Sequence, residues 1–240
     1  MTRTAIIAAM PAELKPLTRG WQHSRQNGVH LWRWSFADGE WIAGCAGAGI
    51  QAATRAFAEV EKTGVVDKLI STGWAGALRE ELAPGKALDV SAVIDARTGE
   101  RFVTAVPLSD RCLVTSPKVA DAYEKLWLAE TYSAALVDME ASAIARLAQM
   151  RGILFYCIKG ISDGYNDQLP DFNRFISTNG QFQMSRFVLF AAFHPRYWPA
   201  LIRMGENSKR ASRAIADSLL DLVDKDGEIR RLNGYPNHAR

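Results

Sequence analysis

Short apolar runs alternate with longer amphipathic segments along the first 160 residues. A run this short that is apolar throughout is typical of a strand buried on both faces of a sheet. The chain also has two β-like runs, Val29–Phe36 and Trp41–Cys45, on either side of an Asp-Gly pair, and this pattern predicts a hairpin. The strands predicted in this way are residues 4–9, 67–72, 87–94, 134–137 and 153–159.

Between these runs, apolar positions recur every three or four residues, as they do on one face of a helix. Pro117 is expected at the first position of its helix, where its missing N–H costs nothing. Strands that alternate with helices indicate an α/β fold, here a single domain with a mixed, mostly parallel central sheet flanked by helices. The predicted helices are residues 12–17, 50–62, 117–128, 138–151, 171–193 and 197–223.

The domain organisation follows from the same pattern. We expect an α/β core over residues 1–170, a C-terminal helical extension of the same domain over 171–225, and a frayed tail over 226–240. No repeat or linker composition interrupts the chain.

The composition is that of an ordinary globular protein, with 240 residues, 48% hydrophobic and 23% charged. A chain of this length buries a sizeable core without a disulfide or metal. The net charge of +3 gives no reason to expect nucleic acid as a partner. Cys45, Cys112 and Cys157 are too scattered for a metal or disulfide pattern. The longest late apolar run, Phe187–Phe193, is too short to span a membrane, so we expect a cytoplasmic protein without cofactor or metal.

Several candidate site residues stand where predicted strands end. Glu13 follows the first strand, Gly49 follows the hairpin, and Thr72–Gly76 and the pair Ser162 and Asp163 end later strands. Ligands of open α/β sheets bind outside the carboxyl ends of the strands, so these segments are expected to meet in one crevice. Each glycine alone is equally well explained by a tight turn.

Two acidic residues open the predicted helix at 138–151. Asp138 and Glu140 can simply favour the helix dipole there. Glu140 can also accept hydrogen bonds from two vicinal hydroxyls, while Met139 packs against a sugar ring. Asp163 also has two interpretations: it can donate a proton to a substrate, or it can cap the segment that follows it.

A different enzyme class has weaker support. Gly47, Gly49 and Ala52 match the spacing of a dinucleotide-binding turn, and Asp67 stands 20 residues beyond Gly47. This pattern would belong to a nicotinamide-dependent oxidoreductase. The fingerprint normally follows the first strand, whereas here a strand and a hairpin precede it.

Five short motifs in a fixed order carry a family resemblance. Together they resemble the nucleoside phosphorylase/nucleosidase family, and most closely its branch of methylthioadenosine/S-adenosylhomocysteine nucleosidases. The motifs are Ala9–Glu13, Gly47–Gly49, Ser71–Gly76, Val137–Ala141 and Ile161–Asp163.

The C-terminal part carries a looser resemblance. Asp167–Pro170, followed by helices that contain Pro199–Ile202 and the pair Asn207 and Ser208, is similar to the hopanoid-associated phosphorylase-like nucleosidases. Those enzymes act on adenosylhopane, an adenine nucleoside with a large lipid on its 5′ carbon.

The resemblance implies cleavage of the N-glycosidic bond of a purine nucleoside, with adenine as the expected base. Asp163 would protonate or hydrogen-bond the purine N7, and Glu140 would hold the ribose hydroxyls beside Met139. Glu13 would activate water, so hydrolysis is favoured. Phosphorolysis remains the alternative, because Arg3, Arg19 and Arg55 lie close in sequence to the expected site. The family also implies a homodimer or larger homo-oligomer.

The remaining substrate-binding residues implied by the resemblance are Gly49, Gly73, Ser162 and Trp74. Trp74 departs from the family, because the nucleosidases have a small polar residue at this position. A bulky indole there either reshapes the pocket or packs in the core. It leaves open a non-catalytic nucleoside-binding or membrane-surface protein.

The segment 174–213 has seven basic residues and one acidic residue, interleaved with aromatic side chains. It is expected to pack on the domain or at a dimer contact, or else to rest on anionic lipid as a peripheral membrane contact.

Overall fold

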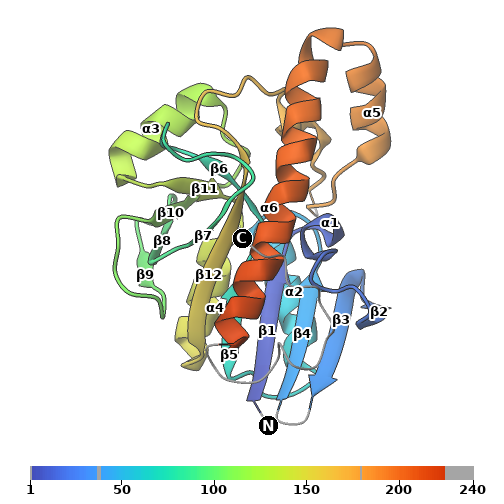
Figure 1. The fold of residues 1–240 in the computed structure, drawn as a ribbon, viewed down its shortest axis with the longest axis vertical. Coiled ribbons are helices and arrows are strands. Elements are labelled where there is room, and N and C mark those ends of the chain that lie inside the picture. Colours follow the sequence, from blue (N-terminus) through green and yellow to red (C-terminus); the bar gives the residue numbers. More distant parts are fainter. Residues whose placement is uncertain (1, 37–38, 179, 225–240) are drawn as a thin grey trace.

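A mixed sheet of twelve strands runs through the part of the chain that the structure describes, residues 2–36, 39–178 and 180–224 of a computed structural model (Figure 1). The strand order is β2-β3-β4-β1-β5-β12-β6-β11-β10-β8-β9, and β7 pairs with β12. The strands are β1 Thr2–Ala8, β2 Gln22–Gln26, β3 Val29–Phe36, β4 Gly39–Cys45, β5 Lys68–Ser71, β6 Trp74–Ala77, β7 Ala87–Asp89, β8 Ala92–Asp95, β9 Arg101–Val103, β10 Cys112–Thr115, β11 Leu136–Asp138 and β12 Leu154–Asp163.

Helices cover both faces of this sheet, so the predicted α/β class is confirmed. Side chains of β1 alternate between two cores. Ile7 packs with residues of α2 and α4, and Ile6 packs with Ile215 of α6 on the other face. The helices are α1 Pro11–Leu14, α2 Ile50–Glu61, α3 Ala122–Tyr132, α4 Ala141–Arg151, α5 Met184–Ala192 and α6 Trp198–Asp224.

The central strands β4, β1, β5 and β12 are mutually parallel. Their register brings the carboxyl ends to one edge. Ile7 pairs with Ser71 of β5, and Ser71 also pairs with Cys157 of β12. The segments that follow these strands, including Glu13 and the turn Gly47–Gly49, therefore begin side by side.

Strand β12 continues four residues beyond its predicted end and joins two parts of the sheet. Its first half pairs with β5 and its second half with β6. The register shifts between Ile161 and Asp163, as in a β-bulge, which redirects the side chains at the strand end. Strand β6 itself was not predicted, because its sequence Trp-Ala-Gly-Ala has the appearance of a glycine turn.

Three predicted helices differ from the structure. The helix expected from Pro117 begins at Ala122, because the Asp121 side chain accepts a hydrogen bond from the Glu124 N–H and caps it there. The helix expected over 12–17 is the single turn α1. The helix expected over 171–193 is a 3-10 turn, Phe172–Phe175, then a bridge between Ile176 and Phe182, and only then α5.

Helix α6 runs along the sheet and continues past its carboxyl edge, where α5 also lies (Figure 1). It packs directly on β12, because a Cβ on Gly160 would lie 2.8 Å from Ile215 Cδ1 and 2.9 Å from Ala211 Cβ. No helix among the described residues is long and apolar enough to cross a bilayer. The division at residue 170 stays a prediction, and the expected frayed tail lies outside the described residues.

The three cysteines, Cys45, Cys112 and Cys157, are buried and free. Burial raises the pKa of the Cys45 and Cys157 thiols to about 12. Both therefore remain protonated at neutral pH.

Candidate functional site

Glu13 is held in one orientation by three backbone N–H groups. Its Oε2 accepts hydrogen bonds from the Ala9 and Met10 N–H groups at 2.8 Å, and its Oε1 accepts from the Trp74 N–H at 2.9 Å. Burial raises the pKa of this carboxyl, while the three N–H donors and a nearby lysine act against the rise. Gly73, at φ +116°, is needed beside it, since a Cβ there would lie 3.0 Å from the carboxylate.

Glu140 lies at the start of α4 and reaches the turn after β4. Its Oε1 accepts a hydrogen bond from the Gly49 N–H at 2.6 Å, and its Oε2 accepts one from the Met139 N–H at 3.3 Å. Burial raises the pKa of Glu140 to about 8, and the neighbouring Asp138 carboxylate adds to the rise. Lys159 and the Gly49 N–H oppose it.

An ion pair with both side chains fully buried lies beneath these glutamates. The Lys159 Nζ is 2.9 Å from Asp138 Oδ2 and donates a hydrogen bond to the Thr72 carbonyl at 3.0 Å. Asp138 also accepts hydrogen bonds from the Thr115 hydroxyl at 2.8 Å and from the Ala141 N–H at 2.9 Å. Every oxygen of Asp138 is thus occupied, and its place is structural: it caps α4 and neutralises Lys159.

Lys159 was missed as a site residue. The signal that could have found it is a charged side chain within the apolar run 153–159, where burial requires a partner. Its ammonium lowers the pKa of both Glu13 and Glu140 and so favours their ionised forms. Burial acts to lower the pKa of Lys159, but the pKa is raised overall because Asp138, Cys157 and Glu140 together outweigh it.

Asp163 ends β12 with both carboxylate oxygens occupied. The Ser162 hydroxyl donates to Oδ1 at 2.5 Å, and the Lys125 ammonium pairs with Oδ2. Lys125 comes from α3 and also donates to the Gly164 carbonyl at 2.7 Å. Lys125 was not among the predicted site residues, because nothing in the sequence of an amphipathic helix marks one lysine as buried.

The Trp74 indole is fixed against α6. Its Nε1–H donates to the Ser212 hydroxyl at 2.9 Å, while its backbone N–H holds Glu13. The two ends of the residue therefore have separate tasks: the backbone orients the carboxylate and the ring packs on the C-terminal helix.

The turn Gly47–Gly49 has its three successive N–H groups in use. They donate to the carbonyls of Ala9 and Gly180 and to the Glu140 carboxylate, in chain order. A Cβ on Gly47 would lie 2.5 Å from the Gly180 oxygen, so the segment after the 3-10 turn Phe172–Phe175 lies directly on the Gly47–Gly49 turn.

The dinucleotide interpretation is wrong on geometric grounds. Asp67 precedes β5 and accepts a hydrogen bond from the Arg3 N–H at 2.7 Å, at the amino end of the parallel strands. The Gly47–Gly49 turn lies at their carboxyl end. A ribose bound at the turn could not reach Asp67.

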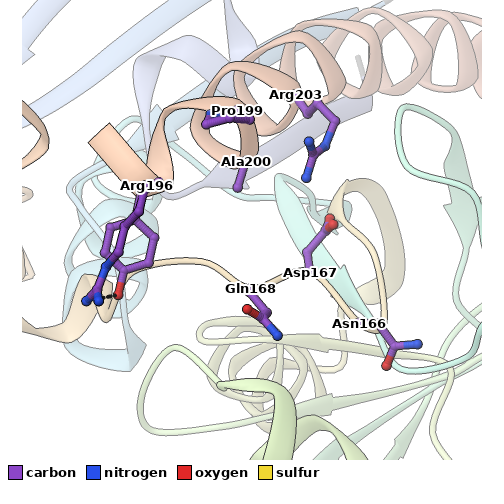
Figure 2. A pocket seen from close by; sticks show the side chains of 8 residues that line it. Asn166, Asp167, Gln168, Arg196, Pro199, Ala200 and Arg203 are labelled. Atoms are coloured by element: carbon purple, nitrogen blue, oxygen red, sulfur yellow. Dashed lines mark hydrogen bonds between the residues drawn. The ribbon is translucent and has the colours of Figure 1, made fainter. Parts of the chain in front are cut away.

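A pocket of about 530 Å³ lies between the loop after β12 and the start of α6 (Figure 2). One wall is the loop after β12, which the Asp167 carboxylate ties back by accepting a hydrogen bond from the Gly164 N–H at 2.7 Å. The other wall is the start of α6, with Arg203 and the Arg196–Tyr197 pair.

The predicted residues form three adjoining groups. Glu13 lies with Gly73 and Trp74, Glu140 with Met139 and Gly49, and Asp163 with Ser162. Lys159 lies between the two glutamate groups, and β6 brings Asp163 opposite Gly76.

A model of the phosphorylase superfamily matches residues 3–125 and 98–189, most of the chain. The chain belongs to this superfamily. Among curated protein sequences none matches. As a superfamily member, the chain shares its fold with solved structures at low identity. The 5′-methylthioadenosine/S-adenosylhomocysteine nucleosidase of Helicobacter pylori, complexed with an inhibitor, has a TM-score of 0.71 at 15% identity, covering 93% of this chain and 98% of that one.

Two further superfamily structures are similarly close in fold. The futalosine hydrolase of Helicobacter pylori has a TM-score of 0.71 at 15% identity and covers 93% of this chain and 98% of its own. The 5′-methylthioadenosine nucleosidase of Arabidopsis thaliana has a TM-score of 0.70 at 15% identity and covers 95% and 98%. At these identities the likeness establishes a common fold, and the activity must be argued from the site.

Proposed function

We propose that this protein hydrolyses the N-glycosidic bond of a purine nucleoside. The observation that carries the proposal is a set of three oriented carboxylates on linked segments. The Gly47–Gly49 turn bonds both Ala9, beside Glu13, and Glu140, and Trp74 bonds Glu13 and pairs with the strand that Asp163 ends. The superfamily match and the nucleosidase and hydrolase structures that share the fold support it.

The three carboxylates differ in environment and so suit different tasks. Glu13 accepts three N–H bonds, an arrangement that favours an ionised base able to take a proton from water. Glu140 has its Oε2 only weakly engaged and suits the vicinal ribose hydroxyls, with Met139 against the ring. Asp163 faces the purine and, with its lysine partner, serves the leaving base.

Water is favoured over phosphate because the Gly47–Gly49 turn has no N–H group left for an anion. All three successive N–H groups of the turn already donate to protein acceptors. The runner-up, phosphorolysis, would require an anion site that displaces one of these bonds. A non-catalytic binding protein is less well supported, because the Trp74 ring packs on α6.

We further propose that the 5′ substituent extends into the pocket between Asp167 and Arg203, toward α5 (Figure 2). A hopanoid or other large apolar group at that position stays a prediction, as do adenine as the base, the cytoplasmic location and a homo-oligomeric state.

Peripheral membrane contact is a related proposal with its own observation. No residue of α5 is buried, and apolar side chains of residues 184–203 are exposed. This segment contains three arginines and no acidic residue. A two-fold contact with a second copy would bring these arginines together, whereas anionic lipid complements them. The exposed apolar residues are Met184, Val188, Leu189, Phe193, Trp198 and Ile202.

The test of the activity is chromatographic detection of free base. The protein, dialysed free of phosphate, is incubated with adenosine, inosine, methylthioadenosine and a 5′-alkyl adenosine, each with and without added phosphate. Base release without phosphate that is lost in Asp163→Asn, with the melting temperature retained, supports hydrolysis. Release only with phosphate would establish phosphorolysis, and no release from any nucleoside would reject the proposal.

The membrane proposal is tested by sedimentation with phosphatidylglycerol vesicles, using phosphatidylcholine vesicles for comparison. We expect binding to the anionic vesicles that Leu189→Ser and Phe193→Ser each weaken. Val65→Ser, an equally exposed apolar position elsewhere, is the matched control. Equal sedimentation with and without vesicles would reject the contact.

A further inference from the structure

An ammonium group lies directly behind the carboxylate that faces the purine. The Lys125 side chain is 4% exposed and that of Asp163 12%, so the aspartate is the member of the pair nearer to solvent. The Lys125 Nζ donates to Asp163 Oδ2 and to the Gly164 carbonyl. Lys125 can therefore act on a bound base only through Asp163.

The surrounding backbone leaves room for this pair. A Cβ on Gly76 would lie 3.0 Å from Asp163 Oδ2 and 3.1 Å from Lys125 Cε. A larger residue at this position of β6 would force the Asp163 and Lys125 side chains to shift. The Ser162 hydroxyl donates to the other oxygen, Oδ1.

The hydrogen bonds fix where the protons lie before substrate binds. An ionised carboxylate is an acceptor only, and Asp163 accepts at both oxygens from an ammonium and a hydroxyl. The transferable proton of the pair is therefore carried by Lys125, although Asp163 is the group that faces the purine.

We propose that Lys125 is a positioning residue that supplies, through Asp163, the proton for the departing purine. The inference rests on the proposed function. As the C1′–N9 bond breaks, its electron pair moves into the base. The Lys125 ammonium passes a proton to the Asp163 carboxylate, and N7 takes that proton from Asp163, which leaves Lys125 neutral. Glu13 takes one proton from the water that attacks C1′. That proton then returns from Glu13 to Lys125 through solvent, so both residues regain their starting protonation states.

Few other charges lie next to this pair in the part of the chain that the structure describes. Asp167 accepts from the Gly164 N–H, and Glu124 on α3 pairs with Lys118 at 3.1 Å. Lys118 is exposed, which makes it a suitable matched control for the buried lysine.

The experiment compares wild type, Lys125→Met, Asp163→Asn, the double variant and the control Lys118→Met. It uses whichever nucleoside wild type cleaves fastest and measures kcat and KM from pH 5 to 9, with melting temperatures as a check on folding. We expect Lys125→Met to lose at least 100-fold in kcat at pH 7, with little change in KM. The pH profile of the remaining activity should differ in shape from that of wild type, because solvent must then supply the proton that Lys125 supplies in wild type. The double variant should be no slower than Asp163→Asn alone.

A second measurement separates proton supply from packing. In Lys125→Ala, added ethylamine should restore part of kcat, and tetramethylammonium, which has no proton to give, should not. Wild-type kcat in Lys125→Met, or a uniform loss with an unchanged pH profile and no amine rescue, would overturn the inference while leaving the hydrolase proposal intact. Failure of wild type to release base from any nucleoside would overturn both.

Discussion

Replacing Glu140 by glutamine is expected to remove a destabilisation that grows as pH rises. Burial raises the pKa of Glu140 to about 8 in the folded chain, against an ordinary pKa of 4.5. Between these two values the unfolded chain has lost the proton and the folded chain has kept it. The folded state binds more protons, so the free energy of unfolding falls as pH rises through this window and levels off above it.

The size of the effect follows from the two pKa values. The difference between a pKa of 4.5 in the unfolded chain and about 8 in the folded chain corresponds to at most about 5 kcal/mol in the free energy of unfolding. Glu140 is only half-buried by surface area, and the solvent it retains reduces that cost. Between pH 5 and pH 9 we therefore expect the free energy of unfolding of wild type to fall by about 2 kcal/mol relative to that of Glu140→Gln. The glutamine oxygen can still accept from the Gly49 N–H, so the contact between α4 and the turn is retained.

The assay is urea unfolding of both proteins at pH 5, 7 and 9, followed by tryptophan fluorescence. With a slope of about 3 kcal/mol per molar, the midpoint difference between variant and wild type should grow by roughly 0.7 M across this range. Glu13 also has a raised pKa, but it is present in both proteins and cancels in the comparison. A midpoint difference that stays constant with pH, or that favours wild type at pH 9, would refute the reasoning.

Further predictions concern the support of the site. Lys159→Met should cost about 3–5 kcal/mol in urea unfolding because it leaves Asp138 buried and unpaired, whereas Arg174→Met, in a pair with Asp171 whose two side chains are exposed, should change stability by less than about 0.5 kcal/mol. Trp74→Phe removes the bond to Ser212 and should lose about 1 kcal/mol with kcat within a factor of three of wild type; a 100-fold loss at unchanged melting temperature would place the ring in the substrate pocket. Gly47→Ala should destabilise more than Gly99→Ala in thermal melts, because only the first new Cβ meets a backbone oxygen, at 2.5 Å; equal losses would show that φ alone matters.

The core of the fold was accessible from sequence because its strands are buried on both faces. Apart from Thr4, runs such as 4–9 and 134–137 contain only apolar side chains, and this pattern indicates both strand and class. Strand β6 could not be predicted from the sequence, because its position depends on a long-range contact between Gly73 and Glu13. The break in the predicted helix 171–193 has the same kind of cause, because the Gly180 carbonyl accepts a hydrogen bond from the Ala48 N–H in the Gly47–Gly49 turn.

The site residues also divide into those that a local sequence pattern predicts and those that depend on long-range contacts. Glu13, Glu140 and Asp163 were accessible because each is an acidic residue at the end of a strand or the start of a helix. Lys125 was not, because its burial depends on Gly76 lying opposite Asp163 on a strand that no local pattern predicts. The Trp74 ring could not be placed either, since its partner Ser212 lies 138 residues away.

Helix α6 is unbroken, and it therefore fixes the relative position of two distant regions. The same helix carries Trp198 beside α5 and Ser212 beside Trp74, with no break between them. Fourteen residues of helix correspond to about 21 Å, so the exposed apolar segment and the carboxylates are held at a fixed separation and tilt. Any surface on which α5 rests would therefore set the height and direction at which the mouth of the site opens. A long apolar substrate could then be drawn from that surface without the protein releasing it.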